Sequence, residues 1–134
     1  MRRVLDAWPV CKWLQGDRKI AGRIASLLED AAAGRIELFM SLINAGEVFY
    51  TIAKQREMTE AEDFLNKVLP GMPITTLTPD NALIIEAARW KAKTKIACAG
   101  GFALATAARL KARLVTGDPE MKGLPTDLVE WIGG

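Results

Sequence analysis

Short apolar runs typical of strands alternate with longer stretches typical of helices along this 134-residue chain. This alternation constrains the fold more than any other feature. The strand-like runs lie at residues 4–5, 35–40, 74–77, 113–116 and 127–132. Strands separated by helices usually pair in parallel, with helices covering both faces of the sheet. We therefore expect one α/β domain over residues 1–134, a three-layer α/β/α sandwich around a mostly parallel sheet.

The helical stretches carry recognisable start signals. The periodicity predicts helices over residues 8–14, 19–33, 42–55, 59–68, 79–93 and 102–111. Ser41 occupies an N-cap position, Thr59 and Glu62 have the spacing of a capping box, and Thr78 precedes a proline at the first helical position. The stretch 102–111 is apolar almost all round, so we expect that helix to be central.

The chain contains no histidine, and this absence excludes whole classes of chemistry. Ser-His-Asp and Cys-His catalysis are impossible without an imidazole. Two cysteines, Cys11 and Cys98, cannot build a four-thiolate zinc site. Any enzymatic chemistry must therefore rest on carboxylates, lysines, hydroxyls or a hard metal ion held by oxygen atoms.

Charge and hydropathy favour a cytoplasmic protein that does not enter a membrane. The N-terminal apolar run is broken by Asp6, which makes it too short for the core of a signal peptide. No stretch approaches the ~18 uninterrupted apolar residues of a membrane span. The net charge of +2 is too small to indicate nucleic-acid binding by itself.

Three carboxylates are predicted to meet at one edge of the sheet. Asp6 and Asp118 each follow a strand-like run, and parallel strands end at the same edge, where ligands bind in open sheets. Glu47 lies three residues after Asn44, which lies three after Ser41. Residues three apart share a helix face, so one helix presents a hydroxyl, an amide and a carboxylate near that edge.

Clustered carboxylates favour a hard cation. Neighbouring carboxylates repel each other unless a cation such as Mg²⁺ or Mn²⁺ neutralises them. Such sites commonly support phosphodiester hydrolysis, which needs no histidine. Simpler interpretations stay open: Asp6 as a helix N-cap, Asp118 as a turn residue and Glu47 as a solvated helix residue.

Four stretches of the sequence together resemble the PIN domain family, and within it the VapC-type toxins of bacterial toxin–antitoxin pairs. They are residues 4–7, 41–48, 102–108 and 114–119, reading VLDA, SLINAGEV, FALATAA and LVTGDP. The resemblance implies a PIN-like α/β sandwich and a Mg²⁺- or Mn²⁺-dependent endoribonuclease. It also implies a homodimer and a cognate antitoxin that covers the active site.

The resemblance assigns roles to individual residues. Asp6, Glu47 and Asp118 match the acidic positions that hold the metal and act in catalysis in that family. Asn44 and Thr116 match supporting polar positions. Ser41, three residues before Asn44, adds a hydroxyl by its spacing and not by the resemblance. Glu120 falls where many members carry a further acid.

One position departs from the family pattern. The family usually has an aspartate just before the stretch that matches residues 102–108, and Gly100 stands there. Glycine brings no ligand and weakens a helix by up to ~1 kcal/mol in its interior. Three interpretations stay open. The metal binds more weakly through the remaining acids, or catalysis is lost while RNA or partner binding is kept. The third is an inactivating change that is tolerated because a fully active toxin is hard to maintain in a cell that expresses it.

Basic and aromatic residues are candidates for contact with RNA. The basic candidates are Arg89, Lys91, Lys93, Lys95, Arg109, Lys111 and Arg113. Phosphate contacts supply most of the non-specific affinity for nucleic acid, although a solvated helix face has the same composition. Of the four tryptophans, only Trp8 is expected near the acids, and the others are expected in core or dimer contacts.

Three hypotheses of function follow. The first is a metal-dependent endoribonuclease of the toxin type, which hydrolyses RNA. The second is a catalytically silent module of the same fold that binds RNA or an antitoxin. A distant third is a phosphatase-like hydrolase that uses the same acids.

Overall fold

The computed structural model describes residues 1–134, and its five strands form one parallel sheet. The strands are β1 (Arg2–Leu5), β2 (Glu37–Ser41), β3 (Ile74–Leu77), β4 (Arg113–Thr116) and β5 (Val129–Trp131). Their order across the sheet is β3-β2-β1-β4-β5, and every neighbouring pair is parallel. The predicted parallel α/β fold is confirmed.

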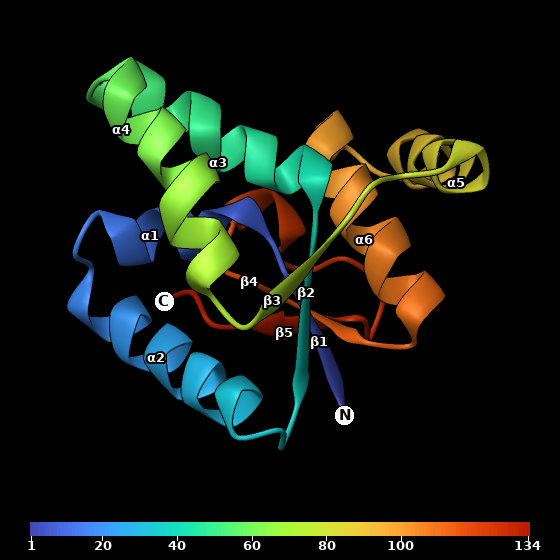
Figure 1. Cartoon of the computed structure of the whole chain (residues 1–134). Coiled ribbons are helices and arrows are strands. Elements are labelled where there is room, and N and C mark those ends of the chain that lie inside the picture. Colours follow the sequence, from blue (N-terminus) through green and yellow to red (C-terminus); the bar gives the residue numbers. More distant parts are fainter.

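Helices cover both faces of this sheet (Figure 1). Helices α1 (Ala7–Leu14), α2 (Arg18–Ala32), α3 (Leu42–Gln55) and α4 (Met58–Asp63) lie on one side. Helix α6 (Cys98–Leu110) packs on the other side, with α5 (Asn81–Lys93) outside it. A π-helical turn, η1 (Phe64–Val68), and two 3₁₀ turns, η2 (Leu69–Gly71) and η3 (Pro119–Met121), complete the chain.

Successive apolar side chains of the central strands point alternately into two hydrophobic cores, one on each face of the sheet. In β1, Val4 packs beneath α6 whereas Leu5 packs beneath the α1–α3 layer, and both are fully buried. Leu114 and Val115 of β4 divide between the two cores in the same way. Successive side chains of a strand point to opposite faces, so both faces of these strands must be apolar when helices cover both.

Helix α6 begins at Cys98, four residues before the predicted start at residue 102. It therefore contains Gly100 and Gly101, although glycine has a low helix propensity. A Cβ added at Gly101 would lie 2.6 Å from the carbonyl oxygen of Ala87 in α5. Glycine is present because the α5 and α6 backbones approach closely there, and this contact outweighs its low helix propensity. The prediction that this helix is central is confirmed, because its middle residues are buried.

The predicted start of α4 is wrong. The helix begins at Met58, no side chain caps it, and Thr59 lies within its first turn. The Thr59 hydroxyl donates a hydrogen bond to Glu57 (3.2 Å) instead of accepting one from the helix backbone.

The predicted start of α5 is also displaced. Asp80, rather than Thr78, is the N-cap, because its carboxylate accepts a hydrogen bond from the Leu83 amide (2.8 Å). The same carboxylate forms an ion pair with Arg109 of α6 (2.8 Å), which lowers the pKa of Asp80 to about 2.

The sheet brings the carboxyl ends of β1, β2 and β4 to one edge. Asp6 follows β1, α3 follows β2 directly, and Gly117 and Asp118 follow β4. No helix of the structure is long and apolar enough to cross a bilayer.

Candidate functional site

Asp6 is the most deeply buried carboxylate at this edge, with 4% of its surface exposed. One of its oxygens accepts a hydrogen bond from the Ala7 amide (2.9 Å) and the other from the Thr116 hydroxyl (2.7 Å). The pKa of Asp6 is raised to about 7, chiefly by burial and also by the nearby carboxylates of Glu47 and Asp118, against the lowering effect of the Thr116 hydrogen bond. The Asp6 carboxyl group is therefore partly protonated near pH 7 unless a cation stabilises its charge.

Thr116 joins Asp6 to Asp118. Its buried hydroxyl donates to Asp6 and accepts a hydrogen bond from the Asp118 amide (3.1 Å). The Asp118 carboxylate in turn accepts from the Glu120 amide (3.1 Å), which makes Asp118 the N-cap of η3. These bonds fix the backbone after β4, so Asp118 is held at the same edge as Asp6.

Asn44 orients Glu47 from within α3. Its fully buried side-chain amide donates to Glu47 (3.2 Å) and to the carbonyl oxygen of Ala99 in α6 (3.0 Å). Its amide oxygen has no hydrogen-bond partner within the protein, although it is buried. Burial raises the pKa of Glu47, opposed by the Asn44 hydrogen bond, and the carboxylates of Asp118 and Glu120 raise it further.

Asp6, Glu47 and Asp118 line one cavity of about 250 Å³. Its wall also includes Trp8 and Lys12 of α1. The Lys12 ammonium lies over the Trp8 ring, 5.6 Å from its centroid. The ring lies so close to the Gly117 backbone that a Cβ at that position would collide with it. Lys12 was not predicted, although its position four residues after Trp8 on a helix was a usable signal.

The donor set of this cavity fits a hard divalent cation. Its three carboxylates offer oxygen ligands, two of them have a raised pKa, and the amide oxygen of Asn44, whose nitrogen donates to Glu47, is buried without a partner. As they stand, however, no three acidic or thiol side chains converge closely enough to hold one ion. A different hydrogen bond holds each carboxylate in its present orientation. Binding of a cation therefore requires these side chains to rotate within the cavity.

The other predicted positions have different surroundings. The buried Ser41 hydroxyl accepts a hydrogen bond from the Ile43 amide (3.2 Å), so it caps α3 and makes no hydrogen bond to the acids. Gly100 lies buried in the first turn of α6, beside the Glu120 carboxylate.

The basic candidates are divided between the two edges of the sheet. Arg109, Lys111 and Arg113 lie where α6 ends and β4 begins, at the edge opposite the acids, so these three do not lie beside the acidic cavity. The exposed Lys95 lies in the α5–α6 connection, two residues before Ala97, whose amide donates to Glu120. Trp13, Trp90 and Trp131 pack against the cores, as expected.

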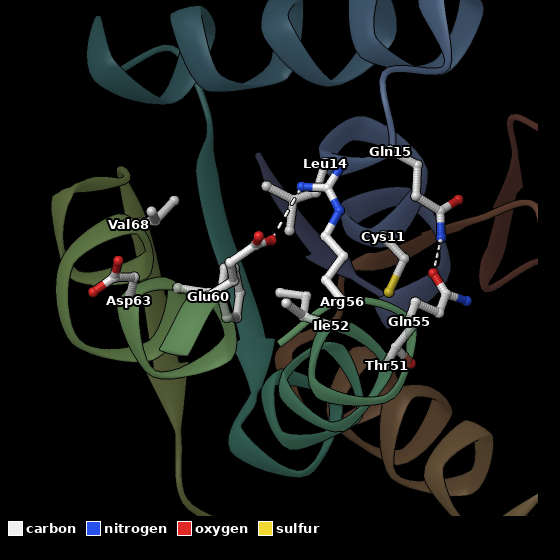
Figure 2. Close-up of a pocket in the computed structure, with 11 residues that line it drawn as sticks. Cys11, Leu14, Gln15, Thr51, Ile52, Gln55, Arg56, Glu60, Asp63 and Val68 are labelled. Carbon is white, nitrogen blue, oxygen red and sulfur yellow. Dashed lines mark hydrogen bonds and ion pairs between the residues drawn. The ribbon is translucent and has the colours of Figure 1, made fainter. Parts of the chain in front are cut away.

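A second cavity of about 240 Å³ adjoins the first, between α1, α3 and α4 (Figure 2). The two cavities share Cys11, Gln15 and Thr51 in their walls. Gln15 donates a hydrogen bond to Gln55 across the second cavity (3.0 Å), as Figure 2 shows. Burial raises the pKa of Cys11 to about 11, so this thiol is not activated.

The fold and this acidic edge define a class of protein. The PIN domain family matches residues 3–126, and the chain belongs to this family. No curated protein matches the chain in a sequence comparison.

Solved structures with the same fold include several bacterial toxins. A toxin–antitoxin complex from Klebsiella pneumoniae has a chain with a TM-score of 0.71 at 15% identity, covering 97% of both chains. FitAcB from Neisseria gonorrhoeae has a TM-score of 0.64 at 21% identity and covers 87% of both chains. VapC20 of Mycobacterium tuberculosis, described as a sarcin–ricin loop cleaving toxin, has a TM-score of 0.64 at 12% identity, covering 88% of this chain and 92% of that one. At these identities the similarity establishes the fold alone.

Proposed function

We propose that the protein is a Mg²⁺- or Mn²⁺-dependent endoribonuclease of the VapC toxin type. The observation that carries this proposal is the convergence of Asp6, Glu47 and Asp118 on one cavity at the carboxyl edge of a PIN-domain sheet. Similarity to toxins, one of them described as a sarcin–ricin loop cleaving toxin, supports the same conclusion. The absence of histidine is consistent with chemistry that needs only oxygen ligands.

Each residue has a distinct task in this proposal. Asp6 and Asp118 would hold the cation, together with Glu47. Thr116 fixes the Asp6 carboxylate through their 2.7 Å hydrogen bond, and Asn44 fixes Glu47. The bound cation would activate a water molecule and stabilise the charge that develops on the phosphate.

The wall of the cavity offers contacts for a substrate strand. The half-buried Trp8 ring provides a surface on which an unpaired base can stack, and the Lys12 ammonium can contact a phosphate. Base stacking on an aromatic side chain contributes roughly 1–3 kcal/mol. Trp8→Ala should therefore weaken the binding of single-stranded RNA several-fold or more, measured by fluorescence anisotropy in Ca²⁺, and should leave Mn²⁺ affinity unchanged.

The test of the proposal is cleavage of RNA across a Mn²⁺ titration, with Asp118→Asn as the inactive variant. Glu29→Gln serves as a matched control, because Glu29 is an exposed acid on α2 outside the cavity. We expect metal-dependent cleavage by the unchanged protein and by Glu29→Gln, and none by Asp118→Asn. RNA left intact beside a hydrolysed phosphomonoester would favour a phosphatase instead.

A catalytically silent module that binds RNA or an antitoxin is the second candidate. Two observations favour it: the first turn of α6 carries no acid at Gly100, and no three acids converge on one point as they stand. This candidate predicts RNA or partner binding without turnover, even at millimolar Mn²⁺.

An antitoxin partner and a homodimer belong to the same proposal. Two of the similar structures, from K. pneumoniae and from H. influenzae (VapBC-1), are toxin–antitoxin complexes. A partner bound in the α1–α3–α4 cavity would also cover the adjoining acids. Ile84 and Ile85 of α5 are exposed, which supports association through this helix, and light scattering of the purified chain tests the dimer.

A further inference from the structure

The α1–α3–α4 cavity of Figure 2 continues the cavity that the acids line. Both have Cys11 and Gln15 of α1 and Thr51 of α3 in their walls. Along α3, Glu47, Thr51 and Gln55 follow at intervals of four residues, so they share one face of the helix. Gln55 lies about 12 Å beyond Glu47 along the helix axis. A strand whose phosphate lies at the acids can therefore place a neighbouring group in the second cavity.

The two glutamines of the chain meet at the edge of this second cavity. The Gln15 amide nitrogen donates a hydrogen bond to the Gln55 amide oxygen (3.0 Å). This bond leaves the Gln15 oxygen as an acceptor and the Gln55 nitrogen as a donor, and Figure 2 shows both atoms on the same side of the bond. The pair can therefore offer one acceptor and one donor to a ligand.

The rest of the wall combines apolar side chains with a guanidinium group. Phe64 is buried, and Leu14 and Ile52 are half-buried. Arg56 extends across the cavity from the end of α3 and donates a hydrogen bond to Glu60 (3.2 Å), as Figure 2 shows. Proteins bind unpaired bases through ring contacts with aromatic or guanidinium groups and through hydrogen bonds to the base edge. This cavity offers both kinds of contact.

The polar groups favour a nucleobase over other occupants. An apolar side chain of a partner protein would fill the interior but would leave the amides of Gln15 and Gln55 unused. A phosphate is disfavoured, because Glu60 and Asp63 add negative charge to the wall. A nucleobase is flat and uncharged and has donors and acceptors along its edge, so it fits the interior and the glutamine pair together.

We propose that this cavity binds the base of a nucleotide next to the scissile bond, and that Gln15 and Gln55 determine which base is accepted. This inference rests on the proposed ribonuclease function and deepens it. The bases carry donors and acceptors in different orders along their edges, so a pair with one acceptor and one donor favours some bases over others. Stacking on Trp8, in contrast, tolerates any base.

The experiment measures the binding of short fluorescent oligomers of adenylate, cytidylate and uridylate by anisotropy in Ca²⁺, separately from cleavage. Gln15→Met and Gln55→Met keep the length of each side chain and remove its amide. Gln55→Glu keeps an oxygen that can accept from Gln15 and replaces the free donor by an acceptor. Asn66→Leu is the matched control, because it removes an exposed amide outside both cavities.

We expect the unchanged protein and Asn66→Leu to bind the preferred oligomer roughly 3- to 10-fold more tightly than the least favoured one, the effect of about one hydrogen bond. Both methionine variants should bind the three oligomers with similar affinities, and Gln55→Glu should change their order. A purely structural role of the glutamines would weaken all three alike and leave the order unchanged. Circular dichroism verifies that every variant is folded.

Preference retained in both methionine variants would overturn this inference, as would equal binding of the three oligomers by the unchanged protein. The proposed function is judged separately, by Mn²⁺-dependent cleavage of RNA. Cleavage with a base preference that the glutamine variants do not alter would overturn the base site and leave the ribonuclease standing. A preference that these variants abolish, without cleavage by the unchanged protein, would support the base site and contradict the proposed catalysis.

Discussion

The unusual protonation of Asp6 makes a prediction about stability in the absence of metal. Asp6 has a pKa of about 7 in the folded protein and an ordinary value of 3.8. Between these values the folded state binds a proton that the unfolded state does not, so the contribution of Asp6 to stability is fully present below about pH 4 and is lost as the pH rises through 7. This direction is opposite to that of most carboxylates in proteins, which stabilise the fold when ionised.

The magnitude follows from the two pKa values. Linkage between them gives a loss of roughly 2–3 kcal/mol in the free energy of unfolding between pH 5 and pH 8. Asp6 is buried, so solvent does not screen this effect to any large extent. Asp6→Asn removes the titration while preserving the size of the side chain and an oxygen that can accept from Ala7. The variant should lose much less stability over this interval, with a smaller residual slope from Glu47.

Urea denaturation in EDTA at several pH values, followed by circular dichroism, measures this difference. At pH 8 we expect Asp6→Asn to be at least as stable as the unchanged protein, although the asparagine weakens the Thr116 hydrogen bond. Parallel stability profiles for the two proteins between pH 5 and pH 8 would refute the reasoning. Glu29→Gln, which alters an exposed acid, should follow the unchanged protein at every pH.

Three further predictions concern the same edge of the sheet and the α5–α6 contact. Mn²⁺ should raise the midpoint of thermal unfolding more at pH 8 than at pH 6, because Asp6 must lose its proton to bind the ion. Thr116→Val should destabilise the protein by about 1–3 kcal/mol at pH 8 in urea denaturation, because the ionised Asp6 carboxylate loses a buried donor. Gly101→Ala should cost about 1–3 kcal/mol, because its Cβ meets the Ala87 carbonyl, whereas Gly22→Ala should be neutral or stabilising by up to ~1 kcal/mol.

Much of the fold was predictable because its elements carry strong local signals. The boundaries predicted for β3, α3 and β4 agree with the structure, since these segments combine clear periodicity with definite ends. The position of the acids at the carboxyl edge of the sheet could also be predicted from the alternation of strands and helices. Parallel pairing requires the residues after β1 and β4 to share one edge.

The failures have tertiary causes. The start of α6 was predicted four residues late because two glycines disfavour a helix locally, whereas close contact with Ala87 requires one of them and the Glu120 side chain fills the space beside the other. Ser41 was predicted correctly as the N-cap of α3, and this local bond occupies the hydroxyl that was also proposed to support the acids.

Within the candidate site, the shared edge of the three acids was predictable and the orientation of their side chains was not. The sequence indicated that Asp6, Glu47 and Asp118 would meet, and they line one cavity. Their rotations depend on hydrogen bonds from residues distant in sequence, such as Thr116 to Asp6 and Asn44 to Ala99. The relation between Gly100 and Glu120 could not be predicted, because it depends on the three-dimensional path of the turn after β4.

Locating manganese in crystals of the protein by anomalous diffraction tests the central claim most directly. Crystals should be soaked in MnCl₂ at pH 8, where Asp6 is ionised. The account predicts one strong peak in contact with the carboxylates of Asp6 and Asp118, with Glu47 turned toward it. Peaks confined to the surface, with none inside the cavity that these three acids line, would contradict it.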